Sequence, residues 1–266
     1  MHKAPSGMSV RVLCLHGYLQ DASVFSSRLG HLRKTNPLKR ECEFTFLNAP
    51  FVVVEDVLDD NRELEDGEGV EDDEDGEHGE NVLDGRYHRQ VLADEVAESS
   101  DGASVVIGRS WWQFSSSASS TSATVRPSQS FEYAGVDVSV GAIRQAIKEH
   151  RIDTIMGFSQ GAAMAAYFAA TQDVADLGVR RLLTYAGFLP KDPHFAEHML
   201  HRGPIPSSLL RTMHVAGTAD ELITIDRTRR LGEVFEGARF VEHPGGHFVP
   251  TTKLEMKDRL VEFLLG

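Results

Sequence analysis

Short hydrophobic runs alternate with amphipathic segments along most of the chain. The runs predict about six strands, and the segments between them repeat apolar residues at helical spacing. Strands separated by helices are typical of a parallel sheet covered by helices on both faces. The expected strands are residues 9–15, 43–47, 153–157, 181–186, 212–216 and 239–242, and the expected helices are 22–34, 136–150, 160–170, 226–235 and 251–265.

Two segments break this alternation, and both precede the third strand. Residues 55–80 contain fifteen acidic residues and one basic residue, so they carry a charge of −14, and the rest of the chain is about +1 against the net charge of −13. Residues 115–130 are rich in serine. Both compositions lack the apolar residues that a packed core needs, so we expect a disordered insertion and a flexible insertion. Together with the length of 266 residues, this predicts one domain spanning 1–266.

The remaining composition limits the class of protein. Outside the acidic segment the chain is nearly neutral, so we expect no nucleic-acid binding. Only two cysteines are present, and the first residues lack the apolar stretch of a signal peptide. No apolar run is long enough to span a bilayer. We therefore expect a cytoplasmic protein with no transmembrane segment, and nothing in the sequence sets its oligomeric state.

The motif Gly157-Phe158-Ser159-Gln160-Gly161 lies between a predicted strand and an alanine-rich predicted helix. In that context G-x-S-x-G is typical of a nucleophile elbow, in which the serine occupies a tight strand-to-helix turn. The alternative is a helix N-cap, which serine often forms. The elbow would place the Gln160 N–H, at the helix start, beside an oxyanion formed on Ser159.

Two further strand ends carry residues that complement a nucleophilic serine. Asp220 and His247 follow the fifth and sixth strands, and the order Ser, Asp, His is that of α/β-hydrolases. Histidine would act as the base, and the aspartate would orient the imidazole. Glu221 or Asp226 remains an alternative acid, and His243 an alternative base.

The turn after the first strand supplies a second candidate oxyanion donor. His16 and Gly17 end that strand, and the Tyr18 N–H would face the same position as that of Gln160. His16 itself favours a structural hydrogen-bonding role over that of a base. The candidate substrate pocket consists of aromatic residues near these turns, although core packing is an equal alternative for the tryptophans: Trp111, Trp112, Phe158 and Phe188. We find no ligand spacing for a metal.

Several blocks of the sequence are specific when they are taken together: Leu15-His16-Gly17-Tyr18-x-Gln20, Asn48-Ala49-Pro50, Arg109-Ser110-Trp111-Trp112, Gly157–Gly161, Gly187-Phe188, Gly217–Asp220 and His243–Pro250. They resemble the FSH group (family of serine hydrolases), and the resemblance covers nearly the whole chain except its two insertions. The resemblance implies an α/β-hydrolase fold, a triad of Ser159, Asp220 and His247, oxyanion donors Tyr18 and Gln160, and no cofactor. Glu221 departs from the proline that the family often has, and the insertions exceed its usual pattern.

These observations favour a serine carboxylesterase that cleaves small or lipid-like acyl esters through an acyl-enzyme on Ser159. The aromatic residues predict short to medium acyl chains. An acyl-protein thioesterase (depalmitoylase) or a lysophospholipase, with the same triad and a longer apolar groove, is the alternative within enzymes. A hydrolase fold without catalysis that serves as a binding module is the alternative outside them.

Overall fold

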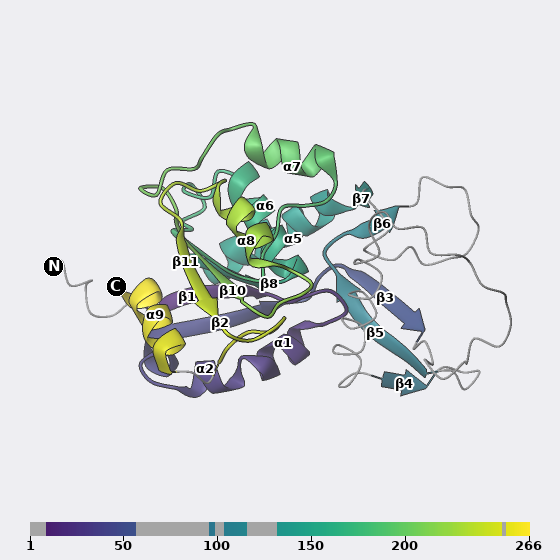
Figure 1. Ribbon diagram of the computed structural model, residues 1–266, viewed down its shortest axis with the longest axis horizontal. Helices are drawn as coiled ribbons and strands as arrows, with labels where there is room; N and C mark the ends of the chain where they lie inside the picture. Colours follow the sequence, from purple (N-terminus) through teal and green to yellow (C-terminus); the bar gives the residue numbers. More distant parts are fainter. Residues whose placement is uncertain (1–8, 57–95, 99–103, 116–131, 252–253) are drawn as a thin grey trace, which may run out of the picture.

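A parallel sheet forms the centre of the computed structural model, which describes residues 9–56, 96–98, 104–115, 132–251 and 254–266. Its strands are β1 (Val10–Leu15), β2 (Cys42–Leu47), β8 (Thr154–Phe158), β9 (Arg181–Tyr185), β10 (Arg211–Gly217) and β11 (Arg239–His243). They lie in the order β11-β10-β9-β8-β1-β2, and every neighbouring pair is parallel. The predicted α/β architecture with about six parallel strands is confirmed (Figure 1).

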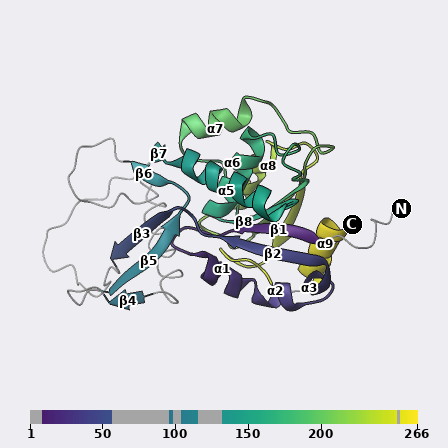
Figure 2. The ribbon, with the colours of Figure 1, turned by 180° about the vertical axis from the view of Figure 1, so that it is seen from behind.

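Helices cover both faces of this sheet (Figures 1 and 2). One face carries α5 (Val136–His150), α6 (Gln160–Thr171) and α8 (Ile225–Gly232), with α7 (Pro193–Leu200) packed on α6. The other carries α1 (Ala22–Arg28), α2 (Gly30–Lys34), α3 (Leu38–Glu41) and α9 (Leu254–Leu265).

The alternation of side chains along a strand explains the two layers. In β1, Leu13 and Leu15 point into the core beneath α5 and α6, whereas Val12 and Cys14 point into the core beneath α1 and α9. All four are almost completely buried. The last four residues of β1 are apolar and point alternately to the two faces of the sheet, so both faces must be covered and the arrangement has three layers.

Two smaller sheets arise from segments for which the sequence predicted no strands. In the first, β5 (Ser104–Ser110) pairs antiparallel with β3 (Phe51–Asp56) and β4 (Val96–Glu98). In the second, β6 (Gln113–Ser115) pairs with β7 (Glu132–Ala134). Most of the acidic segment 55–80 and of the serine-rich segment 115–130 lies outside the described residues, so the expected disorder and flexibility of these insertions stay predictions.

The predicted helix 22–34 is divided, because α1 ends before Leu29 and α2 begins after it. The stretch between the predicted strands 181–186 and 212–216 contains α7, a helix that the sequence analysis did not expect. Asp192 caps α7 by accepting a hydrogen bond from the His194 N–H at 2.9 Å, and Pro193 occupies its first turn. Proline at this position starts a helix because its missing N–H would have no acceptor there.

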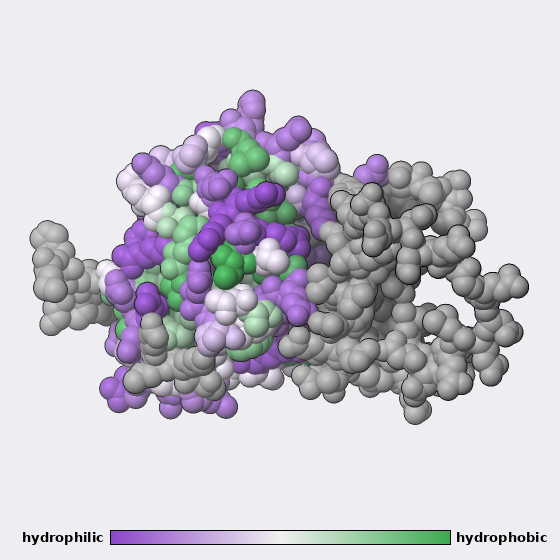
Figure 3. All heavy atoms as spheres, in the orientation of Figure 1, coloured by the Kyte–Doolittle hydropathy of each residue, from purple (hydrophilic) through white to green (hydrophobic). Residues whose placement is uncertain are grey.

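Cys14 and Cys42 are both buried, free thiols. Burial raises the pKa of the Cys14 thiol far above its ordinary value, and it raises that of Cys42 to about 12. Both therefore pack as apolar residues. On the face shown in Figure 3, hydrophobic residues form small groups among hydrophilic ones. None of the described helices has the length and apolar character needed to cross a membrane.

Candidate active site

Ser159 occupies the turn between β8 and α6 in a strained backbone conformation. Its φ of 52° and ψ of −119° lie in a region that residues with a side chain rarely adopt. The flanking glycines make this turn sterically accessible. A Cβ on Gly157 would lie 2.4 Å from the Gly161 carbonyl oxygen, and a Cβ on Gly161 would lie 2.3 Å from that of His16. The predicted strand, turn and helix are therefore present, with α6 packed directly against the end of β1.

The loops after β10 and β11 are joined by backbone hydrogen bonds. The Thr218 N–H donates to the His243 carbonyl at 2.8 Å, and the Ala219 N–H donates to the Gly245 carbonyl at 3.1 Å. A Cβ on Gly217 would lie 2.3 Å from the Gly245 oxygen, so only glycine permits this approach. The pairing brings the segments of Asp220 and His247 together.

The structure brings Ser159, His247 and Asp220 into one hydrogen-bonded row. His247 Nε2 lies 3.0 Å from Ser159 Oγ, and His247 Nδ1 lies 2.8 Å from Asp220 Oδ2. Asp220 Oδ1 accepts from the N–H groups of Leu222 and Ile223 at 3.0 Å and 2.8 Å. The carboxylate is buried and has hydrogen bonds at both oxygens, so it is held in a single orientation.

The alternative acid and base lie elsewhere. His243 is at the end of β11, where its Nδ1 accepts from the Gly245 N–H at 3.2 Å and its ring packs against Phe248. Glu221 and Asp226 are exposed. The N–H groups that donate to Asp220 Oδ1 belong to Leu222 and Ile223. Glu221, where the family often has proline, donates neither of these hydrogen bonds.

The two candidate oxyanion donors belong to neighbouring turns. Parallel pairing places Leu15 of β1 opposite Gly157 of β8, so the turn containing Tyr18 leaves the sheet beside the turn containing Ser159. Gln160 begins α6, and its N–H therefore has no acceptor within the helix.

The side chain of Gln160 has a structural role that the sequence analysis missed. Its Oε1 accepts from the Trp111 N–H at 3.0 Å, and its Nε2 donates to Ser110 Oγ at 2.9 Å. These bonds hold the Ser110–Trp111 segment against the start of α6. The only signal in the sequence was that the block Arg109–Trp112 and the block Gly157–Gly161 both belong to the set that resembles the FSH group.

The predicted pocket residues occupy different environments. Trp111 is fully buried, and its indole N–H donates to the His16 carbonyl at 2.8 Å, so it packs in the core. Phe158 is 2% exposed and lies between Phe25 and His247. Trp112 stacks on Tyr133 at 4.7 Å between ring centroids. Phe188 is partly buried beneath the Arg227 guanidinium. Contact of any of the four with substrate stays a prediction.

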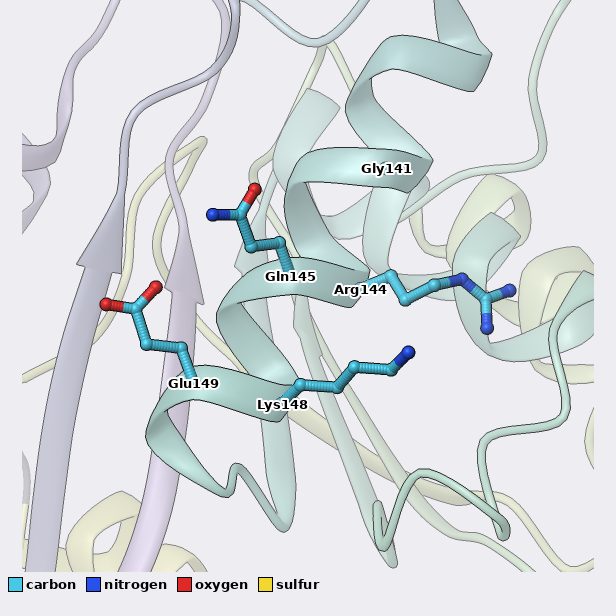
Figure 4. A pocket seen from close by; sticks show the side chains of 5 residues that line it. All are labelled: Gly141, Arg144, Gln145, Lys148 and Glu149. Atoms are coloured by element: carbon cyan, nitrogen blue, oxygen red, sulfur yellow. The ribbon is translucent and has the colours of Figure 1, made fainter.

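A hollow on the outer side of α5 lies apart from the row of three residues. It is lined by Gly141, Arg144, Gln145, Lys148 and Glu149 (Figure 4). Arg144 and Lys148 point away from Gln145 and Glu149, so the polar groups do not converge on a common point. Within the described part of the chain, no group of three or more His, Cys, Asp or Glu residues is arranged to hold a metal ion.

Known proteins resemble this chain over nearly its whole length. The profile described as serine hydrolase (FSH1) matches residues 6–258. The chain belongs to the FSH1 serine hydrolase family. Among known relatives, "Esterase OVCA2" of Danio rerio is 28% identical over 249 residues, which cover 92% of each chain. "Esterase OVCA2" of Homo sapiens is 28% identical over 245 residues, which cover 91% of this chain and 89% of the relative.

Solved structures share the fold of this FSH1 family member. Acyl-protein thioesterase 2 of Zea mays aligns with a TM-score of 0.52, covering 98% of this chain and 96% of its own at 16% identity. Esterase PE8 also aligns with a TM-score of 0.52, at 14% identity, covering 99% and 97%. At these identities the likeness establishes the fold.

Proposed function

We propose that this serine hydrolase is a carboxylesterase in which Ser159, His247 and Asp220 form the catalytic triad. The single observation that carries the proposal is the position of His247, whose ring nitrogens lie within hydrogen-bonding distance of the serine hydroxyl and the buried carboxylate. The names of the FSH1 relatives support ester hydrolysis.

The geometry supports one role for each group. Because Asp220 accepts from Nδ1–H, the lone pair of His247 is on Nε2 and can take the Ser159 proton. Ser159 Oγ then attacks the acyl carbonyl, while the N–H groups of Tyr18 and Gln160 donate to the oxyanion. His247 protonates the departing alcohol and leaves an acyl-enzyme. Water then gives a proton to His247 and attacks the acyl carbon. The bond from that carbon to Ser159 Oγ breaks, His247 returns the proton to Oγ, and the acid is released.

Labelling with a fluorophosphonate probe tests this assignment. We expect the wild-type protein to be labelled, Ser159→Ala to lose all labelling, and its kcat on a p-nitrophenyl ester to fall by about 10⁶. Ser208→Ala, at an exposed serine, is the matched control and should label normally. His247→Ala should lose activity whereas His243→Ala should retain most of it. Labelling that persists in Ser159→Ala would refute the proposal.

For the substrate, we propose a small or lipid-like ester with a short to medium acyl chain. The partly buried ring of Phe188 and the aromatic group of Trp112, Phe114 and Tyr133 support recognition of the acyl part. A series of p-nitrophenyl esters from acetate to palmitate tests the preference. Fastest turnover of palmitate would contradict it, and faster cleavage of a palmitoyl peptide thioester than of the matching ester would favour the thioesterase alternative. The two buried free thiols support a reducing, cytoplasmic location.

A further inference from the structure

The residues of the turn after β1 are linked in a closed ring of hydrogen bonds, which begins at His16. The Ala49 N–H donates to His16 Nε2 at 3.0 Å. A backbone N–H can only donate, so Nε2 must carry the lone pair and Nδ1 the proton. His16 Nδ1–H therefore donates to the Gly17 carbonyl, which lies 2.7 Å away. Two backbone groups from different segments thus fix both the tautomer and the orientation of this ring.

Gln20 holds the same glycine from the other direction. The side-chain Oε1 of Gln20 accepts from the Gly17 N–H at 3.2 Å, and the backbone N–H of Gln20 donates to the Gly17 carbonyl at 3.3 Å. Both polar backbone groups of Gly17 therefore have partners. A peptide plane fixed at its carbonyl cannot rotate, so the orientation of the next N–H, that of Tyr18, is fixed as well.

Arg109 closes the ring. Its guanidinium donates to the Ala49 carbonyl at 2.9 Å, and its backbone exchanges hydrogen bonds with Leu19 and Gln20, each at 3.0 Å. Leu19 has a φ of 59°, in the left-handed region. A Cβ at position 108 would lie 2.1 Å from the Leu19 carbonyl oxygen, so glycine there permits β5 to press against the turn. The turn is held in a conformation that it would not retain alone.

We propose that His16 is a positioning residue that fixes the Gly17–Tyr18 peptide so that the Tyr18 N–H donates to the oxyanion. In a trans peptide the carbonyl and the following N–H point in opposite directions. With the Gly17 carbonyl directed toward His16, the Tyr18 N–H is directed away from that ring, in the turn that lies beside Ser159. The inference rests on the proposed esterase function and adds a residue that does not touch substrate.

Burial keeps His16 in the required form at neutral pH. The residue has no solvent exposure, and burial lowers its pKa to about 4, so the imidazole is neutral. Only the neutral ring can accept from Ala49 and donate to Gly17 at the same time. A preorganised donor is effective because it needs no rearrangement when the negative charge develops.

Substitution of His16 by leucine and by asparagine tests the role. Leucine removes both hydrogen bonds, and we expect kcat to fall about 10²-fold with KM changed less than threefold, since one oxyanion donor is worth about 10²–10³ in rate. Asparagine retains a donor near the position of Nδ1 and should recover at least tenfold. His214→Leu, at another buried histidine whose ring contacts Thr184, is the matched control; its folded fraction should keep the wild-type kcat.

A readout specific to the oxyanion separates positioning from general packing. An alkyl trifluoromethyl ketone forms a hemiketal oxyanion on Ser159, whereas the corresponding alcohol forms none. In His16→Leu, affinity for the ketone should fall in parallel with kcat, and affinity for the alcohol should stay unchanged. Equal losses for ketone and alcohol, or a kcat within threefold of wild type in the folded variant, would overturn the inference.

A further variant covers the case in which His16 variants do not fold. Arg109→Met keeps the backbone pairing with Leu19 and Gln20 but loses the guanidinium contact to Ala49. We expect its kcat and ketone affinity to fall about tenfold, and unchanged values would overturn the inference. If the wild-type protein shows no labelling that depends on Ser159, the proposed function itself fails, and this outcome is distinct from an active enzyme that is indifferent to His16.

Discussion

Replacement of Asp220 by asparagine tests the orientation of His247 with little change in shape. Asparagine has one oxygen where aspartate has two. Leu222 and Ile223 donate N–H groups to Oδ1 at 3.0 Å and 2.8 Å, so the amide oxygen should occupy that position. The amide NH₂ group then faces His247 Nδ1, which must become an acceptor. The proton moves to Nε2, and the histidine can no longer take the proton of Ser159.

The expected loss follows from this change of tautomer. A triad with the wrong tautomer and intact geometry loses about 10⁴ in kcat, which corresponds to about 5 kcal/mol of transition-state stabilisation. Stability should change little, because the two backbone donors keep an acceptor. Asp220→Ala, by contrast, leaves both N–H groups without this acceptor and should lower the free energy of unfolding by about 1–3 kcal/mol for each buried group.

Two measurements separate the effects. Steady-state hydrolysis of a p-nitrophenyl ester gives kcat, and urea unfolding followed by circular dichroism gives stability. We expect Asp220→Asn to be inactive and nearly as stable as wild type, and Asp220→Ala to be both inactive and less stable. An asparagine variant that keeps more than a tenth of the wild-type kcat would show that another group orients His247, and the triad assignment would then be abandoned.

Further predictions concern backbone packing and buried charge. Gly161→Ala places a Cβ 2.4 Å from the Leu15 carbonyl oxygen and should lower the urea midpoint sharply or prevent folding. Gly141→Ala, whose Cβ would have no atom within 4 Å, should raise the free energy of unfolding by about 0.5–1 kcal/mol. Equal urea midpoints for the two variants would contradict the steric argument. Burial lowers the pKa of His214 to about 3, against an ordinary value of 6.5. Between these values the unfolded chain binds a proton there that the folded chain does not, so stability falls as pH decreases. His214→Gln should reduce that slope by about 1.4 kcal/mol per pH unit, and parallel profiles of stability against pH would exclude the effect.

The sequence was most informative where one local pattern determines the structure. A buried strand such as β1, which ends in four consecutive apolar residues, can be recognised alone. The turn around Ser159 could be predicted because the two flanking glycines mark positions where the backbone approaches too closely for a Cβ. The order of Ser159, Asp220 and His247 then indicated which strand ends should meet, and the coordinates bring those side chains within hydrogen-bonding distance.

Features that depend on distant contacts could not be derived in this way. The bonds from the Gln160 side chain to the segment of Ser110 join residues fifty positions apart, and no periodicity encodes them. The pairing of β3 with β5 depends on strands separated by a long insertion. Helix α7 was missed for a different reason: no helix was predicted between residues 186 and 212, although proline after the capping Asp192 starts one.

Strand β11 borders the sheet and pairs only with β10 among the described strands. The segment that presents His247 to Ser159 therefore follows an edge strand, which has a hydrogen-bonded neighbour on one side where an interior strand has two. Only two of the five residues of β11 are buried. Fraying at this margin would separate the imidazole from the hydroxyl while the interior strands stay assembled. During gentle denaturation, turnover should consequently vanish before the bulk of the secondary structure does.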